Sequence, residues 1–131
     1  MTLVLTAARR VAAIGLCAVA TLAAPATALP AAAAAGADLY ITVTPRDEGA
    51  HSMHLTCDPD GGFHPRPVEA CEVLHSVKGY FRNLNVNPGA CPRIWDPIEV
   101  EVNGHWYGRP NPYYQEFPNP CEMERKLGPI V

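Results

Sequence analysis

Four cysteines restrict the fold of this chain more strongly than any other feature. They are Cys57, Cys71, Cys91 and Cys121, and the fifth cysteine, Cys17, lies in an N-terminal segment with the pattern of a secretory signal. An even number of cysteines in a small secreted domain predicts disulfides, here two. The spacing leaves all three pairings open, although sequential pairing would give each disulfide a separate part of the chain to hold.

Residues 1–28 are predicted to be a signal peptide. Arg9 and Arg10 form a basic start, residues 11–24 are a nearly unbroken apolar run, and Ala-Thr-Ala at 26–28 is a small-x-small cleavage site. A retained membrane anchor is the alternative, but the run is short for a span, which needs about 20 residues. We therefore expect a secreted, extracellular protein that leaves the membrane after cleavage. Residues 29–38 are expected to be a flexible, Ala-rich segment ahead of one domain over residues 39–131.

The charge balance and the shortage of nucleophiles exclude two classes of function. Loss of Arg9 and Arg10 takes Lys+Arg from 10 to 8 against 13 acidic residues, so the formal net charge becomes −5. Without a basic cluster, this charge argues against a nucleic-acid partner. Beyond the signal the only serines are Ser52 and Ser76, neither in a Gly-x-Ser-x-Gly pattern, and bridged cysteines supply no thiolate. The chain is not expected to be an enzyme.

The histidines are expected to be solvated surface residues rather than metal ligands. There are five of them: His51, His54, His64, His75 and His105. The first two are three positions apart, which places them on opposite faces of a strand. The chain has no His-Glu-x-x-His pattern, and its cysteines are better used in disulfides. No metal or cofactor is predicted.

Short runs of β-forming residues predict an antiparallel sheet. Strands are expected at residues 39–44, 52–57, 98–102 and 113–117. The third run alternates apolar and acidic residues, as a half-buried strand does. The Asn-Gly pair at 103–104 is the preferred type I′ hairpin turn, and the strand after it would carry Trp106 and Tyr107. Pro110 and Pro112 interrupt this strand, which predicts an edge or a bulge.

One helix is predicted over residues 68–84. Its apolar residues recur at helical spacing on a single face: Val73, Val77, Tyr80, Phe81 and Leu84. Residues 119–126, around Cys121, are expected to form a short helix or turn. Strands and helix together predict an α+β domain with a helix packed on an antiparallel sheet.

The segment Cys-Pro-Arg-Ile-Trp-Asp-Pro at 91–97 is the candidate functional motif. Each proline fixes its own φ and favours an extended conformation for the residue before it, while Cys91 can attach the segment to the fold. The result should be a stiff, extended loop that presents Arg93 outward. Serine proteases bind substrates in an extended form, and a loop that is already ordered loses little entropy on binding. The segment therefore predicts a protease-binding loop.

Two other interpretations of these features remain open. The chain could be a secreted, non-inhibitory binding module whose contact face is formed by Trp106, Tyr107, Tyr113 and Tyr114, in which case it would affect no protease. It could also be a protease substrate or a zymogen-type protein that is cut after Arg93, which rapid and complete cleavage would reveal.

The chain closely resembles the Streptomyces subtilisin inhibitor (SSI) family of secreted bacterial protease inhibitors, from about residue 39 to about residue 123. Five segments carry the resemblance: Leu-Thr-Cys at 55–57 followed by a Pro/Gly-rich loop with His-Pro at 64–65, Ala-Cys at 70–71, the motif at 91–97, Val-Asn-Gly-His-Trp at 102–106, and Asn-Pro-Cys-Glu-Met at 119–123. The proline-rich region at 110–120, the residues after 126 and the small Ala90 depart from the family pattern.

The resemblance implies a two-layer α+β fold with a five-stranded antiparallel sheet, two helices and a homodimer formed through the sheet. It implies the disulfides Cys57–Cys71 and Cys91–Cys121, and a scissile bond between Arg93 and Ile94. Arg93 would then be P1, and its neighbours would be Ala90 at P4, Cys91 at P3, Pro92 at P2, Ile94 at P1′ and Trp95 at P2′, with Asp96 next in the loop.

The partners expected for such a loop are serine proteases. An acidic, trypsin-type S1 pocket would pair with the Arg93 guanidinium, and a broader subtilisin-type pocket can accept its long stem. We therefore expect both trypsin-like and subtilisin-like targets, with trypsin favoured. Asn119, two residues before Cys121, is a candidate to support the loop through its amide, and the alternative for it is an ordinary turn residue.

Overall fold

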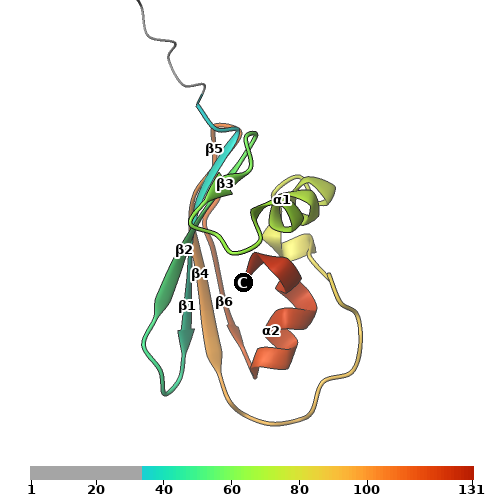
Figure 1. Cartoon of the computed structure of the whole chain (residues 1–131). Helices are drawn as coiled ribbons and strands as arrows, with labels where there is room; N and C mark the ends of the chain where they lie inside the picture. Colours follow the sequence, from blue (N-terminus) through green and yellow to red (C-terminus); the bar gives the residue numbers. More distant parts are fainter. Residues whose placement is uncertain (1–33) are drawn as a thin grey trace, which may run out of the picture. The chain divides into compact units, whose positions relative to one another are not determined.

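The computed structural model describes residues 34–131, in which helices cover one face of an antiparallel sheet (Figure 1). The longer strands are β1 (Ala37–Pro45), β2 (His51–Cys57), β4 (Ile98–Trp106) and β6 (Tyr113–Phe117), and two-residue strands are β3 (Gly61–Gly62) and β5 (Arg109–Pro110). The helices are α1 (Pro67–Ser76) and α2 (Pro120–Leu127), with short 3₁₀ turns η1 (Phe81–Asn83) and η2 (Gly128–Ile130). Among the described residues, no helix is long and apolar enough to span a bilayer.

The sheet is five strands wide. Its order is β3-β2-β1-β4-β5, and β6 also pairs with β4. β5 lies opposite residues 105–106 of β4 and β6 lies opposite residues 98–102, so the two are consecutive parts of one interrupted strand. Proline cannot donate to a ladder, which places Pro110 and Pro112 at the interruption of this edge strand as predicted. The predicted α+β fold, with its antiparallel sheet and two helices, is confirmed.

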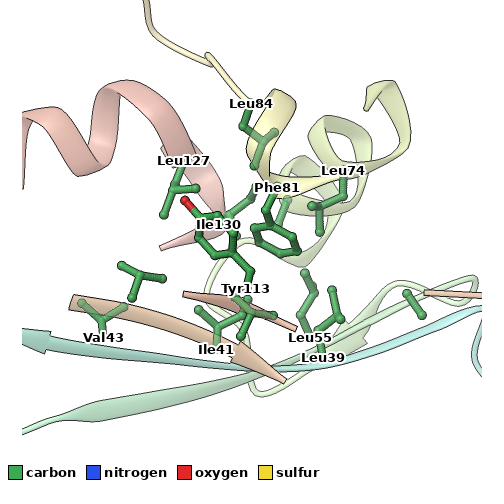
Figure 2. Close-up of a cluster of buried hydrophobic side chains, with 14 of the residues drawn as sticks. Leu39, Ile41, Val43, Leu55, Leu74, Phe81, Leu84, Tyr113, Leu127 and Ile130 are labelled. Carbon is green, nitrogen blue, oxygen red and sulfur yellow. The ribbon is translucent and has the colours of Figure 1, made fainter. Parts of the chain in front are cut away.

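The core lies between the sheet and the helices (Figure 2). Alternate residues of β1, such as Leu39, Ile41 and Val43, are fully buried, while Tyr40 between them is exposed. Leu74 of α1 and Leu127 of α2 cover this face. The alternation therefore produces a sheet with one covered face and one uncovered face, as is common for antiparallel sheets.

Two disulfides join the helices to the rest of the fold in the sequential pairing. Cys57–Cys71 connects the end of β2 to α1, with an S–S distance of 2.05 Å. Cys91–Cys121 connects the segment before β4 to the first turn of α2, with an S–S distance of 2.04 Å. The pairing implied by the family resemblance is confirmed.

The helix predicted over residues 68–84 is too long, because α1 ends at Ser76. Lys78 and Gly79 have φ values of 54° and 74°, which a helix cannot contain, and the Gly79 N–H donates to Leu74 O at 2.8 Å. A Cβ on Gly79 would lie 2.4 Å from the Trp106 indole, so the chain turns away where this ring packs. The predicted stripe is therefore not one helix face: Phe81 and Leu84 are buried but lie beyond α1, Tyr80 is exposed, and the buried residues of α1 itself are Ala70, Cys71 and Leu74.

The hairpin turn predicted at Asn-Gly 103–104 is wrong as well. β4 continues through both residues to Trp106, and the turn is formed by Tyr107 and Gly108, with φ values of 48° and 76°. Gly104 lies opposite Leu39 of β1, where a Cβ would come within 2.0 Å of the Asp38 carbonyl oxygen. This glycine therefore permits close approach of two strands rather than a turn.

The domain begins earlier than predicted. β1 starts at Ala37, which is buried, and the Gly36 N–H donates to Asp58 O at 3.1 Å. Residues 36–38 therefore belong to the fold and not to a flexible segment. The predicted signal peptide over residues 1–28, and the segment that follows it as far as residue 33, lie outside the described residues.

His64 is not a solvated surface residue. Its side chain is 7% exposed, its Nε2 lies 3.0 Å from Ile130 O, and its Nδ1 accepts a hydrogen bond from the Arg66 N–H at 3.1 Å. The Arg66 guanidinium also donates to Val131 O at 3.2 Å. The β3–α1 connection is therefore attached to the C-terminal residues through contacts that no local pattern in the sequence predicts.

Candidate functional site

The candidate loop connects η1 to β4 over residues 84–97 and contains no helix or strand. It passes outside α2 and returns to the sheet beneath it in Figure 1. Arg93 is exposed, Ile94 is 54% exposed and Trp95 is 63% exposed, whereas Cys91 is partly buried. Two large apolar side chains next to an arginine are thus left in solvent, at the positions that the sequence predicted.

Around Arg93 the backbone of this loop is held at Pro92, Ile94 and Asp96. Nδ2 of Asn119 donates to Pro92 O at 3.2 Å and to Ile94 O at 3.1 Å. The Asp96 N–H donates to Pro118 O at 2.8 Å. Successive residues of an extended chain point in opposite directions. The two carbonyls that Asn119 holds therefore lie on one side of the loop, and the Arg93 carbonyl between them is directed to the other side.

Asn119 uses all of its hydrogen-bonding groups. It is the N-cap of α2, where Oδ1 accepts a hydrogen bond from the Glu122 N–H at 3.1 Å, and both amide hydrogens are directed at the loop. Its side chain is only 2% exposed, so water cannot easily replace these bonds. One residue therefore sets the start of a helix and holds the carbonyls on either side of Arg93.

The first half of the loop is attached to the other end of α2. The N–H groups of Val86 and Asn87 donate to Lys126 O and Arg125 O, at 3.3 and 2.8 Å. Nη1 of Arg125 donates to Gly89 O at 3.2 Å, and its guanidinium forms an ion pair with Glu122 one turn earlier. The loop is thus attached along the length of α2, and the Cys91–Cys121 disulfide lies between the two sets of bonds.

The arrangement offers a peptide for recognition and no chemistry of its own. Ser52 lies on β2, 2.8 Å from the Thr42 hydroxyl, and the Ser76 hydroxyl donates to Val73 O on α1, so neither serine belongs to the loop. Cys57 and Cys71 lie near Asp60 as a metal site would require, but their sulfur atoms are bonded to each other. What the loop can do is occupy a cleft that binds extended peptides.

The contact face predicted for a binding module is not present. Trp106 and Tyr113 are 6% and 7% exposed and belong to the core, where the Tyr113 ring stacks on Phe81 with centroids 5.1 Å apart. Of the four predicted residues, Tyr107 and Tyr114 are exposed. Burial of two of the four rings removes the surface on which this alternative depended.

Sequence reasoning identified the loop and Asn119 but missed the other supporting residues. Pro118 and Arg125 hold the loop through a carbonyl and a guanidinium, groups that carry no distinctive local signal. The sequence offered one indication of this support: Asn119 has a proline on each side, a pattern that holds the residue extended at the start of a helix.

Comparison with known proteins adds independent information. The model of the family described as "Subtilisin inhibitor-like" matches residues 26–119. The Subtilisin inhibitor-like protein 12 of Streptomyces hygroscopicus is 38% identical over 101 residues, covering 74% of this chain and 86% of the relative. The Subtilisin inhibitor-like protein 5 of Streptomyces fradiae is 38% identical over 81 residues, covering 60% and 76%.

A solved structure has the same fold. It is the crystal structure of Streptomyces caespitosus sermetstatin in complex with Bacillus licheniformis subtilisin, with a TM-score of 0.57 and 24% sequence identity. The match covers 72% of this chain and 96% of that one.

Proposed function

Because this chain belongs to the subtilisin inhibitor-like family of protease inhibitors, which are not enzymes, we propose that it is a secreted inhibitor of serine proteases that acts through the loop of residues 89–97. The loop enters the protease cleft as an extended strand, with the Arg93 side chain in the S1 pocket. The residues from Ala90 to Trp95 are the positions P4 to P2′, and the scissile bond joins Arg93 to Ile94.

The observation that carries this proposal is the attachment of both sides of that bond to one residue. Asn119 holds the Pro92 carbonyl on the acyl side and the Ile94 carbonyl on the amine side. The Cys91–Cys121 disulfide fixes the acyl side covalently, and the Asp96–Pro118 hydrogen bond fixes the amine side. Neither side depends on the peptide bond between them for its position.

This attachment makes the inhibitor a substrate that is released very slowly. The protease serine attacks the Arg93 carbonyl, the bond to the Ile94 nitrogen breaks, and an acyl-enzyme with a free Ile94 amine results. The fold keeps this amine beside the acyl group at a high effective concentration, so re-formation of the peptide bond competes with hydrolysis. The complex is therefore reversible and long-lived.

Arg93 also determines the preference among proteases. The acidic S1 pocket of a trypsin-like enzyme forms charge-assisted hydrogen bonds with a guanidinium, whereas a subtilisin-like pocket gains only from its apolar stem. We therefore propose that both classes are inhibited and that trypsin-like enzymes are bound more tightly. Sermetstatin, which shares the fold, was crystallised with a subtilisin, which supports the subtilisin-like class.

Titration of trypsin and of subtilisin with the oxidised protein tests the proposal. We expect stoichiometric loss of both activities with the wild type, and no inhibition of trypsin by Arg93→Glu, because a carboxylate is repelled from an acidic S1 pocket. Arg82→Glu, the same charge change at an exposed residue of η1, is the matched control and should inhibit as the wild type does.

Three outcomes would contradict this reading. Unchanged inhibition of trypsin by Arg93→Glu would remove Arg93 from P1. No inhibition of either enzyme by the wild type would favour a non-inhibitory binding protein. Rapid, complete cleavage after Arg93 without inhibition would make the protein a substrate.

A further inference from the structure

A groove lies beside the C-terminal half of the loop. It is formed by residues from the end of β1, from the loop and from the uncovered face of β4 and β6, namely Thr44, Pro45, Arg46, Trp95, Pro97, Glu99 and Glu116. The β1–β2 connection, which begins at Arg46, and the loop lie at the same end of the sheet in Figure 1. Trp95 belongs to both the loop and the groove, so the two surfaces are continuous.

The charged side chains of this groove have no oppositely charged partner among the described residues, and Glu99 instead hydrogen-bonds to Tyr114. Trp95 is 63% exposed. Glu99 and Glu116 lie directly opposite each other on β4 and β6, where like charges are destabilising. No ion pair within residues 34–131 involves either glutamate or Arg46. The exposed indole and the charges without ion-pair partners are therefore available for contact with a partner protein.

A protease bound at Arg93–Ile94 would reach this groove. Its surface beyond the cleavage site must follow the chain over Ile94 and Trp95, and so extends towards Pro97 and Arg46. A standard interface buries about 800 Å² on each partner, which is more than a loop of a few residues supplies. The groove adjoins the loop on the side of Pro97, and the hollow lined by Pro118, Asn119 and Glu122 adjoins it on the side of α2.

We propose that the groove is a second contact surface for the same protease, and that its charges favour enzymes with a basic side chain beside an apolar one beyond the cleavage site. This inference rests on the proposed function, because the reactive loop brings the protease there. The groove is negative because it contains two glutamates and one arginine. Further negative charge comes from the adjoining β1–β2 connection, with Asp47 and Glu48, and from Asp96 in the loop. Trp95 supplies the apolar contact.

Charge reversals outside the loop test the proposal without altering the scissile segment. Glu116→Lys makes the groove less negative and Arg46→Glu makes it more negative. Glu72→Lys, at an exposed position of α1, repeats the first charge change outside the groove. Association rates and inhibition constants would be measured for trypsin and subtilisin at low and moderate ionic strength. Rim charges act mainly on association rate and its salt dependence.

The expected result is that, for the enzyme that the wild type inhibits more tightly, Glu116→Lys lowers the association rate by roughly fivefold or more at low salt and Arg46→Glu raises it. Glu72→Lys should stay within about twofold of the wild type. The proposal is overturned if both groove variants match the wild type, if the signs are reversed, or if Glu72→Lys has an equal effect. In each of these cases the proposed function still stands if the wild type inhibits the protease and Arg93→Glu does not.

Discussion

At the scale of single residues, Asn119 links the stability of the fold to the proposed behaviour of the loop. Its Oδ1 caps α2 and its amide holds the carbonyls of Pro92 and Ile94. The two roles use different atoms of one side chain, so they can be separated by substitution.

Asn119→Asp should keep the cap and lose the loop support, because a carboxylate accepts hydrogen bonds but has no amide hydrogens to donate. Because Asn119 is 2% exposed, a carboxylate that faces two carbonyl oxygens should also lower the stability in urea. Under conditions where the variant stays folded, we expect much faster hydrolysis of the Arg93–Ile94 bond by trypsin, measured by chromatography of the cleaved chain. Asn119→Ala removes both groups and should also lower the free energy of unfolding by about 1–2 kcal/mol. A resistant Asn119→Asp protein would show that the amide bonds do not protect the loop.

Tyr113 makes the fold sensitive to alkaline pH. Burial raises the pKa of Tyr113 to about 12, although the nearby Arg82 guanidinium acts in the opposite direction. The phenol is held neutral in the core, where its hydroxyl lies 2.6 Å from Gln115 Oε1. In the unfolded chain it ionises near pH 10.

Because the folded pKa lies above the unfolded one, the contribution of Tyr113 to stability is complete below about pH 10 and is lost as the pH rises towards 12. Phenolate absorbance of the folded protein should therefore include one late step near pH 12, which Tyr113→Phe removes. Denaturant unfolding of the wild type should weaken more steeply above pH 10 than that of Tyr113→Phe. Identical pH profiles for the two proteins would rule out this contribution.

At the scale of elements, the loop is supported by α2 rather than by the sheet. The disulfide reaches the first turn of this helix, and the hydrogen bonds of residues 86–89 reach its last turn. α2 and the loop therefore form one unit. The Cys57–Cys71 disulfide lies outside this unit, because it joins α1 to β2.

The two disulfides should thus differ in their effect on inhibition. Cys91 and Cys121 are 30 residues apart and Cys57 and Cys71 are 14 apart, and loss of a disulfide of either length costs about 3–4 kcal/mol in the chain-entropy model. At a temperature where both variants stay folded, Cys91→Ser/Cys121→Ser should be cleaved quickly by trypsin. Cys57→Ser/Cys71→Ser should resist cleavage as the wild type does; equal rates for the two would show that stability alone protects the loop.

At the scale of the whole molecule, helices cover one face of the sheet and leave the other open. Tyr40 on β1 and Tyr114 on β6 are 56% and 62% exposed, and Tyr40 stacks on His54 of β2 with ring centroids 4.5 Å apart. The homodimer that the family resemblance implies would fit the part of this open face around Tyr40 and His54, which lies apart from the groove lined by Glu99 and Glu116.

If the protein forms this dimer, Tyr40→Glu, on a central strand of this face, should be monomeric in sedimentation experiments, because a charge would be buried without a partner. Inhibition per chain should persist, since the loop is supported from α2. Phe63→Glu, at an aromatic residue that is 89% exposed in the β3–α1 connection, is the control and should remain dimeric. A monomeric wild type, or a dimeric Tyr40→Glu, would exclude this interface.

The amino-acid sequence by itself determined the class of fold and the position of the loop. Alternation of apolar residues in β1 and β4 records which face is covered, and it can be read locally because a strand repeats every two residues. The cysteine count predicted two disulfides, and the prolines around Arg93 predicted a stiff exposed segment.

Only the tertiary structure decided where several elements end and what holds the loop. Gly79 and Gly104 are needed because the Trp106 ring and the Asp38 carbonyl approach them from other strands. His64 is buried by the C-terminal residues, and Asn119 reaches carbonyls more than 20 residues away in the chain. A pattern within one segment reports burial along that segment, but contact between distant backbones exists only once the chain has folded.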